Sequence, residues 1–257
     1  MRILIVTQDD PFYINPLLRD LLLEPKNQVV GVILSKRNRL HTQKSSADWS
    51  YANTLRIIVG NLRFIWMGIR YLIHKVPFLG GNVLVKQARK QGIPVATLSS
   101  FNSPKSLAYI RSFSPDVIIL QTLNIVKQEF LNIPKKGVIN RQHSLLPRNR
   151  GRLSPFWALY HGDEETGTTI YIPSEGIDEG EILIQETVEI KIDDDFNSLT
   201  KKLYVASRGA IQDALNLLRR GERINFETIN QPTYNTIPTK KEAIEFRAKL
   251  NRKRKNI

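Results

Sequence analysis

Short apolar runs alternate along this chain with segments of helical periodicity, and this alternation is the feature that most limits how the chain can fold. The first run, Arg2–Thr7, is continuous, which is typical of a strand buried on both faces. Further strands are expected at Gln28–Leu34, Pro94–Leu98 and Asp116–Gln121, and helices at Asn15–Leu23, Val83–Gln91, Ser103–Arg111 and Ser198–Arg219. This order predicts an α/β fold with a Rossmann-like, doubly wound, mainly parallel sheet.

Ligands of such sheets bind beyond the carboxyl ends of the strands. The loops after Thr7, Gln121, Asn140 and Tyr171 are therefore the candidate binding loops. A dinucleotide-binding protein would carry glycines in the first of these loops, so that a pyrophosphate could approach the backbone. That loop, Gln8–Tyr13, has no glycine and carries two carboxylates, which repel phosphate. A nicotinamide-dependent enzyme is therefore disfavoured.

The composition excludes further classes. The chain has no cysteine, which removes disulfides, thiolate catalysis and cysteine-ligated metals and favours a reducing compartment. The first apolar run is too short for a signal peptide. The net charge of +14 favours anionic partners, although six basic residues lie in the last eleven positions. Only four histidines are present, none paired with a carboxylate at ligand spacing, so no metal site is expected.

An insertion at about 36–81 interrupts the alternation. A mobile loop is expected at Lys36–Asp48, followed by one helix over Leu55–Val76. This helix is unusually apolar, and arginines at positions 56, 63 and 70 recur every seven residues. The arginines argue against a membrane span. Two alternatives stay open: a helix packed on the domain or on a second subunit, and a helix lying on an acidic membrane surface through 55–76.

The stretch Gly137–Gln185 holds the candidate chemical groups. These are Asn140, Gln142, His143, Ser144, Asp178 and Glu179. A Ser-His-Asp triad is disfavoured because Ser144 lacks the glycines of a nucleophile elbow. An amide, an imidazole and a carboxylate together suit acyl transfer to an amine, in which the amide stabilises an oxyanion and the other two groups handle the proton. A hydrogen-bonded structural loop explains the same residues equally well.

The motifs of this stretch resemble one enzyme family. They are Asn140–Pro147 (NRQHSLLP), Arg150-Gly151, Trp157–Leu159, Gly162-Asp163, Thr166-Gly167 and Asp178–Gly180. Together they are similar to the 10-formyltetrahydrofolate-dependent formyltransferases, which act on glycinamide ribonucleotide, methionyl-tRNA or amino sugars. The resemblance implies a formyltransferase fold, with a catalytic domain at 1–222 and a C-terminal extension with a basic tail at 223–257.

The resemblance also implies the site. Asn140 and Asp178 match the family's essential asparagine and aspartate. The family's histidine position holds Gln142, and His143 follows one residue later. Because adjacent side chains of a strand point to opposite sides, three outcomes are open. The loop shifts so that His143 joins Asn140 and Asp178 as a catalytic residue, Gln142 serves in the site, or catalysis is lost.

Two loops of the resembling family receive the folate, the formyl donor. Here they correspond to Leu123, Asn124, Ile125 and Val126, and to a second loop with Glu175, Gly176 and Ile177, while Gln142 would contact the formyl group. No metal is implied. The expected function is therefore transfer of a formyl group from 10-formyltetrahydrofolate to a primary amine.

Two parts of the chain bear on the identity of the acceptor, namely the first loop and the C-terminal extension. The acidic first loop argues against a ribonucleotide phosphate, and the extension is too short for the barrel domain of methionyl-tRNA formyltransferases. The compact form, the first loop and the basic apolar insertion look most similar to bacterial amino-sugar N-formyltransferases of polysaccharide biosynthesis. This resemblance makes an amino-sugar nucleotide or a lipid-linked glycan the preferred acceptor. The alternatives are a catalytically silent folate- or sugar-nucleotide-binding protein, and a formyltransferase acting on tRNA or a purine precursor. A cytoplasmic protein is expected, with a peripheral membrane contact at the inner face and a homodimer as further options, and without a nucleic-acid partner.

Overall fold

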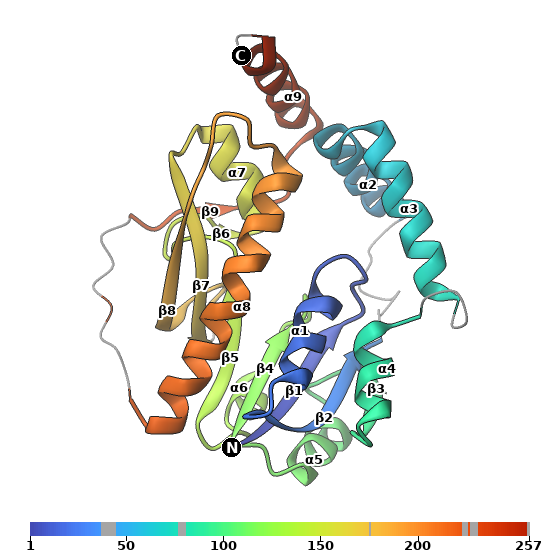
Figure 1. The fold of residues 1–257 in the computed structure, drawn as a ribbon, viewed down its shortest axis with the longest axis vertical. Helices are drawn as coiled ribbons and strands as arrows, with labels where there is room; N and C mark the ends of the chain where they lie inside the picture. Colours follow the sequence, from blue (N-terminus) through green and yellow to red (C-terminus); the bar gives the residue numbers. More distant parts are fainter. Residues whose placement is uncertain (37–44, 77–80, 175, 223–225, 227–230, 256–257) are drawn as a thin grey trace.

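A computed structural model describes residues 1–36, 45–76, 81–174, 176–222, 226 and 231–255. Its centre is a seven-stranded sheet of order β3-β2-β1-β4-β5-β7-β8 (Figure 1). The strands are β1 (Arg2–Gln8), β2 (Gln28–Ser35), β3 (Val95–Leu98), β4 (Val117–Gln121), β5 (Gly137–Gln142), β7 (Glu165–Pro173) and β8 (Gly180–Glu189). The first five strands in this order pair in parallel, whereas β7 is antiparallel to both β5 and β8. The expected α/β fold with a mainly parallel sheet is confirmed.

Helices cover both faces of the sheet. On one face, α1 (Ile14–Leu23), α4 (Val83–Lys90) and α8 (Phe196–Arg220) bury a core that includes Ile5, Ile119 and Ile139. On the other face, α5 (Pro104–Ser112) and the short α6 (Gln128–Leu131) cover Leu4, Ile118 and Val138. Alternate residues of each strand therefore enter different cores, as the period of two requires.

A third apolar cluster joins segments that are far apart in the sequence. It contains α2 (Ser45–Val59), α3 (Asn61–Lys75), α7 (Ser154–His161) and α9 (Lys240–Lys255) (Figure 1). Ile58, Phe156 and Phe246 are buried at its centre. The insertion and the end of the chain thus pack on each other and on α7.

The insertion differs from its sequence-based prediction. One helix was expected over Leu55–Val76, but the structure has two, separated by Gly60 at φ +89° and ψ +153°. That conformation is open to glycine and strained for other residues, so the break is encoded locally. Arg56 consequently lies on α2, apart from Arg63 and Arg70 on α3. A loop was expected at Lys36–Asp48. Residues 37–44 of it lie outside the described residues, and residues 45–48 belong to the first turn of α2.

The C-terminal segment also adds a strand. β9 (Tyr234–Asn235) pairs in parallel with β6 (Arg150–Gly151), which lies within the stretch that carries the candidate chemistry. Arg150 N–H donates to the carbonyl of Thr233, and Arg152 N–H donates to that of Asn235. The described part of the extension therefore supports the candidate site. The division into 1–222 and 223–257 stays a prediction.

Candidate active site

A chain of hydrogen bonds joins Asn140 at the end of β5 to Asp178 in the turn between β7 and β8. Asn140 Nδ2 donates to the hydroxyl of Tyr171 over 3.0 Å, and that hydroxyl donates to Asp178 Oδ1 over 3.0 Å. Burial, followed by the neighbouring Asp178 carboxylate, raises the pKa of Tyr171, which therefore stays a neutral donor. The predicted amide and carboxylate are thus brought together.

The other groups around Asn140 fix the orientation of its amide. Its Oδ1 accepts from Gln121 Nε2 at 3.0 Å and from the backbone N–H of Arg141 at 2.8 Å. Its Nδ2 has two hydrogens to donate. Among the described residues, only the hydroxyl of Tyr171 accepts from this nitrogen. The second N–H is available to a carbonyl oxygen of a bound molecule.

Gln142 contacts the same carboxylate from the other side. Its Nε2 donates to Asp178 Oδ2 at 3.0 Å and also lies 3.0 Å from the carbonyl oxygen of Gly151 and 3.2 Å from Ser154 Oγ. Alternation along β5 explains this position, because Gln142 points to the same side as Asn140. The sequence left three outcomes open. In the structure the side chain of Gln142, rather than that of His143, lies beside Asn140 and Asp178.

The turn that carries Asp178 is short and constrained. Ser174 N–H donates to the carbonyl of Glu179 over 2.9 Å, which closes the turn. Asp178 itself has φ +50°, in the left-handed region that aspartate tolerates better than most residues. A Cβ at Gly180 would lie 1.9 Å from the carbonyl oxygen of Ile172, so this position requires glycine. The sequence Gly176–Gly180 therefore sets where the carboxylate points.

The second oxygen of Asp178 is also held by the backbone. Gly151 N–H donates to Asp178 Oδ2 over 2.8 Å. Gly151 has φ +96°, and a Cβ there would lie 2.1 Å from the carbonyl oxygen of Asn235 in β9. The β6–β9 pair thus fixes one of the donors to the candidate catalytic carboxylate. Sequence analysis named the Arg150-Gly151 motif but missed this role, and it also missed Tyr171 as a site residue; only the position of Tyr171 at a strand end could have suggested it.

His143 lies on the other side of β5, against α8. Arg141 Nη1 donates to His143 Nε2, and the His143 ring meets that of Tyr204 edge-on with centroids 4.5 Å apart. Ser207 Oγ is 3.5 Å from His143 Nε2. Burial, with the Arg141 charge second, lowers the pKa of His143 well below its usual value, so the ring is neutral near pH 7.

The predicted grouping of His143 with Asn140 and Asp178 is therefore not the arrangement in the structure. Within the described part of the chain, no hydrogen bond links His143 to Asn140, Gln142 or Asp178. Ser144, its neighbour in the disfavoured triad, is buried. The period of two along the strand accounts for the separation.

The loop after β1 uses both of its aspartates internally. Asp10 Oδ1 accepts from the backbone N–H groups of Phe12, Tyr13 and Ile14 at 2.9–3.2 Å, at the start of α1. These donors are the ones that an anion would use at a helix N-terminus. A carboxylate of the chain itself therefore takes the place where a phosphate would bind.

Asp9 ties the insertion to the same edge of the sheet. Its Oδ1 accepts from His74 Nε2 at 2.7 Å and from Asn82 Nδ2 at 2.8 Å, and its Oδ2 accepts from Lys75 Nζ at 2.8 Å. Burial alone would raise the pKa of Asp9, but the hydrogen bonds from Lys75, His74 and Asn15 outweigh it and lower the pKa. The carboxylate is thus charged and anchors the end of α3.

Apolar side chains are exposed on both loops that were expected to receive the folate. Leu123 and Ile125 are 65% and 81% exposed, and Ile177 is 56% exposed. Val126, by contrast, packs against the core under α5, and Asn124 Nδ2 donates to Ser35 Oγ over 2.8 Å. Exposed apolar side chains of this kind are what the lining of a site for a flat ring system offers. Gly176 lies in the second loop, whereas Glu175 lies outside the described residues.

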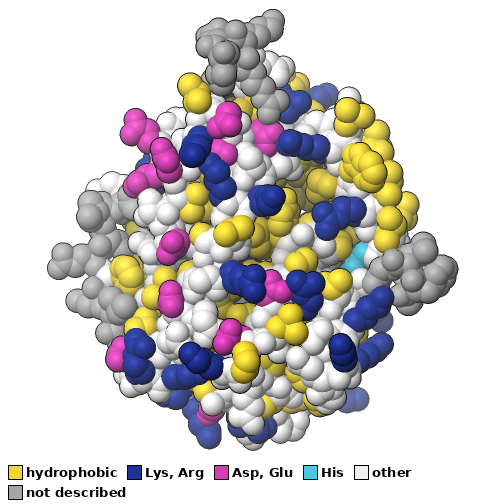
Figure 2. Space-filling model, in the orientation of Figure 1, with side chains coloured by type: hydrophobic (Ala, Val, Ile, Leu, Met, Phe, Trp, Pro, Cys, Tyr) yellow, Lys and Arg dark blue, Asp and Glu magenta, His cyan; other side chains and the backbone are white. Residues whose placement is uncertain are grey.

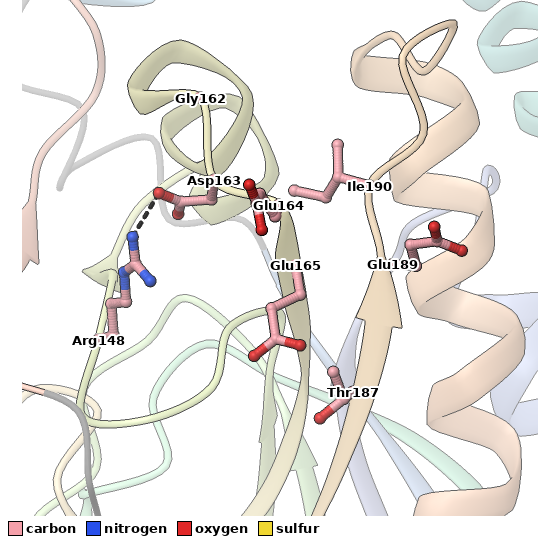
Figure 3. Close-up of a pocket in the computed structure, with 8 residues that line it drawn as sticks. All are labelled: Arg148, Gly162, Asp163, Glu164, Glu165, Thr187, Glu189 and Ile190. Atoms are coloured by element: carbon pink, nitrogen blue, oxygen red, sulfur yellow. Dashed lines mark hydrogen bonds and ion pairs between the residues drawn. The ribbon is translucent and has the colours of Figure 1, made fainter.

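A separate hollow of about 960 Å³ lies at the opposite end of β7. Its walls carry Arg148, Asp163, Glu164, Glu165 and Glu189 (Figure 3). Arg148 donates to Asp163 across one side of it. Burial raises the pKa of Asp163. In the described residues no group of three or more potential ligands could hold a metal ion, and the hollow shares no residue with the Asn140–Asp178 site.

Comparison with known proteins shows the family to which the chain belongs. Residues 82–215, more than half of the chain, match the family described as Formyl transferase. The chain belongs to the formyl transferase family. The matched residues include Asn140, Gln142 and Asp178 together with Tyr171.

The curated relatives of this member of the formyl transferase family include methionyl-tRNA formyltransferases. A methionyl-tRNA formyltransferase from Kosmotoga olearia is 36% identical over 163 residues, which cover 62% of this chain and 52% of that protein. The chain spans about half the length of the curated relatives it matches.

Solved structures share the fold at low identity. A glycinamide ribonucleotide transformylase 1 from Symbiobacterium toebii has a TM-score of 0.63 at 16% identity, covering 91% of this chain and 94% of that one. WlaRD, a sugar 3N-formyl transferase solved in the presence of dTDP and 5-N-formyl-THF, has a TM-score of 0.59 at 15% identity, covering 92% and 69%.

Proposed function

We propose that this chain transfers a formyl group from 10-formyltetrahydrofolate to a primary amine. The observation that carries the proposal is the link from Asn140 through Tyr171 to Asp178, with one amide N–H left for a ligand. In the reaction, a bond forms between the acceptor nitrogen and the formyl carbon, and the bond from that carbon to N10 of the folate breaks. A proton leaves the acceptor nitrogen and one arrives at N10.

Asn140 and Asp178 divide this chemistry. The free N–H of Asn140 donates to the formyl oxygen as negative charge develops on it. The carboxylate of Asp178 accepts the proton of the attacking amine. Gln142 cannot carry a proton, because an amide side chain does not titrate near neutral pH. Its part is to hold Asp178 Oδ2, together with Gly151 N–H, so that the other oxygen and the amide keep their alignment.

Exposed apolar side chains on two loops support binding of the folate there. Leu123, Ile125 and Ile177 offer exposed apolar contacts to the ring system. The loop that carries Leu123 and Ile125 is anchored, because Asn102 Nδ2 donates to the carbonyl of Ile125 over 2.9 Å and Asn102 Oδ1 accepts from Lys127 N–H over 2.9 Å. An anchored loop keeps the apolar pair in place before the ligand arrives.

The acceptor we favour is an amino-sugar nucleotide or an amine on a lipid-linked glycan. The fold resemblance to a sugar 3N-formyl transferase supports it. Asp10 argues against a ribonucleotide whose phosphate would occupy the start of α1, since its carboxylate already accepts three N–H groups there. Residues 1–222 would form the catalytic domain of such an enzyme.

Methionyl-tRNA is the second candidate acceptor. The 36% identity with a methionyl-tRNA formyltransferase favours it, and the net charge of +14 suits an RNA partner. The salt dependence of turnover distinguishes the two acceptors, because release of counterions makes RNA binding fall steeply as the salt concentration rises.

The experiment is an acceptor panel with 10-formyltetrahydrofolate. Release of tetrahydrofolate is followed with amino-sugar nucleotides, glycinamide ribonucleotide and methionyl-tRNA offered separately. Turnover with a sugar nucleotide and none with methionyl-tRNA supports the favoured acceptor. Tight folate binding without turnover on any amine would make the chain a silent binder and end the enzyme proposal.

A further inference from the structure

Helix α3 carries an apolar face that is turned to solvent. Six of its side chains form this face: Leu62, Ile65, Trp66, Ile69, Leu72 and Ile73, each at least 40% exposed. Their spacing of three and four residues puts them on one side of the helix. Figure 1 shows α3 at the outer edge of the molecule, and in Figure 2 apolar side chains line that same edge. We call these six residues the α3 face.

The opposite side of α3 is fixed to the protein. Phe64 and Met67 pack against the cluster formed by α2, α7 and α9. At its C-terminal end, His74 is buried and contacts Asp9 in the loop after β1. The helix is therefore held with its apolar face outward, and the exposure does not come from an unattached segment.

The charged side chains of α3 itself are all positive. The helix sequence from Asn61 to Lys75 contains no aspartate or glutamate. Arg63 and Arg70 flank one edge of the face and Lys75 lies toward the other, as helical geometry places them. Arg63 and Lys75 pair with Asp195 and Asp9, yet their side chains stay 54% and 47% exposed. Arg70 lies over the ring of Phe12 at 5.7 Å and is exposed.

We propose that the α3 face binds the surface of an anionic lipid bilayer. An exposed apolar face with a tryptophan and with cationic edges is what an interfacial helix presents to a membrane. A second copy of the chain is a poorer occupant, because α3 has no carboxylate of its own to face Arg70 and the whole chain carries +14. Among the described residues, no helix is long and apolar enough to cross a membrane.

This inference does not depend on formyl transfer, and its test measures binding alone. The protein is sedimented with vesicles of phosphatidylcholine alone or with phosphatidylglycerol added. We expect binding to the anionic vesicles, a loss of at least tenfold in Ile65→Ser/Leu72→Ser, and unchanged binding in Leu23→Ser/Val205→Ser. The two pairs have similar exposure, 57% and 66% against 52% and 70%. Raised salt and Arg70→Gln should weaken binding, because the attraction is partly electrostatic.

A second measurement follows tryptophan fluorescence instead of sedimentation. Brominated acyl chains in the anionic vesicles should quench Trp66 in the unchanged protein, since its ring would enter the lipid. Trp157 is buried and serves as the reference, seen alone in the Trp49→Phe/Trp66→Phe protein. Absence of both sedimentation and quenching overturns the proposal. So does a lipid-free dimer that Ile65→Ser/Leu72→Ser dissociates, because the face would then belong to a second copy.

Discussion

Gln142 Nε2 donates to Asp178 Oδ2 over 3.0 Å, so the amide that stands in the family's histidine position contacts the proposed catalytic carboxylate directly. The neighbouring His143 instead accepts from Arg141 on the far side of β5. Gln142 and His143, which the sequence left as alternatives for the site, thus make different contacts. Gln142 hydrogen-bonds to Asp178, whereas His143 contacts Tyr204 and Ser207 of α8.

Gln142→Ala should lower kcat by about 10- to 100-fold, because a hydrogen bond to a charged group contributes about 1.5–3 kcal/mol. Gln142→His should do the opposite. An imidazole there can carry a proton, so kcat should rise by up to about 10²-fold and acquire an inflection near its pKa of about 6.5. Steady-state kinetics across pH check both variants. An unchanged rate in Gln142→Ala would remove Gln142 from the site.

Asn140→Ala should lower kcat by about 10²–10³-fold, as expected when one oxyanion donor is removed. The Michaelis constant for the folate should change little, because the lost interaction forms mainly in the transition state. Asn27→Ala is the matched control, since its amide hydrogen-bonds to Leu21, Gln212 and Arg219 rather than to the chain that leads to Asp178. An equal loss of kcat in both variants would show that the effect is structural.

Gly151→Ala should disrupt the pairing of β6 with β9 and reduce kcat together with stability. The new Cβ would lie 2.1 Å from the carbonyl oxygen of Asn235, and φ is +96°. Gly162→Ala is the control for backbone strain, because φ there is +80° but nothing lies within 4 Å of the added carbon. Both variants should lose stability in thermal unfolding, and only Gly151→Ala should also lose activity in the folded protein. Full kcat in folded Gly151→Ala would separate β9 from the site.

Part of the site could be read from the sequence and part could not. Asn140 and Asp178 were predicted from motif positions, and their proximity follows from two strand ends that meet at one edge of the sheet. The side on which His143 lies follows from strand alternation, which the sequence allowed but did not decide, because a shifted loop was equally open. Tyr171 and the backbone of Gly151 could not be predicted, since their roles come from pairing between segments distant along the chain.

The fold, too, could be predicted from the sequence only in part. The strand and helix order predicted the parallel part of the sheet, because buried strands and amphipathic helices have clear local patterns. The break at Gly60 was missed, since the apolar pattern runs through it and a single glycine inside a helical pattern is often tolerated. The packing of α2, α7 and α9 depends on long-range contacts that no local pattern contains.

Gly60→Ala should lower the free energy of unfolding by about 1–3 kcal/mol, because a side chain is strained at φ +89° and ψ +153°. Gly209→Ala is the matched control, an exposed position within α8 where nothing lies near an added carbon. There alanine should raise stability by about 0.8–1 kcal/mol through its helix propensity. Denaturant titration measures both. Equal effects of the two variants would contradict the α2–α3 break.

His143 should make stability depend on pH. Its pKa is lowered in the folded protein, so the unfolded chain binds more protons below the unfolded value of about 6.5. The stability is therefore fully present above about pH 7 and falls as the pH drops below 6.5. Denaturant titrations at pH 7.5 and pH 5.5 should differ less in His143→Gln than in the unchanged protein, whereas His161→Gln should keep the dependence. An unaltered pH dependence in His143→Gln would contradict the buried, neutral ring.

The most direct test of the account is tetrahydrofolate release from 10-formyltetrahydrofolate in the presence of an amino-sugar nucleotide, measured for the unchanged protein and for Asp178→Asn. The account predicts acceptor-dependent release by the unchanged protein, a fall of about 10²–10⁴-fold in Asp178→Asn, and folate binding retained in both. Release at the same rate in Asp178→Asn, or no release with any primary amine despite bound folate, would contradict formyl transfer at this site.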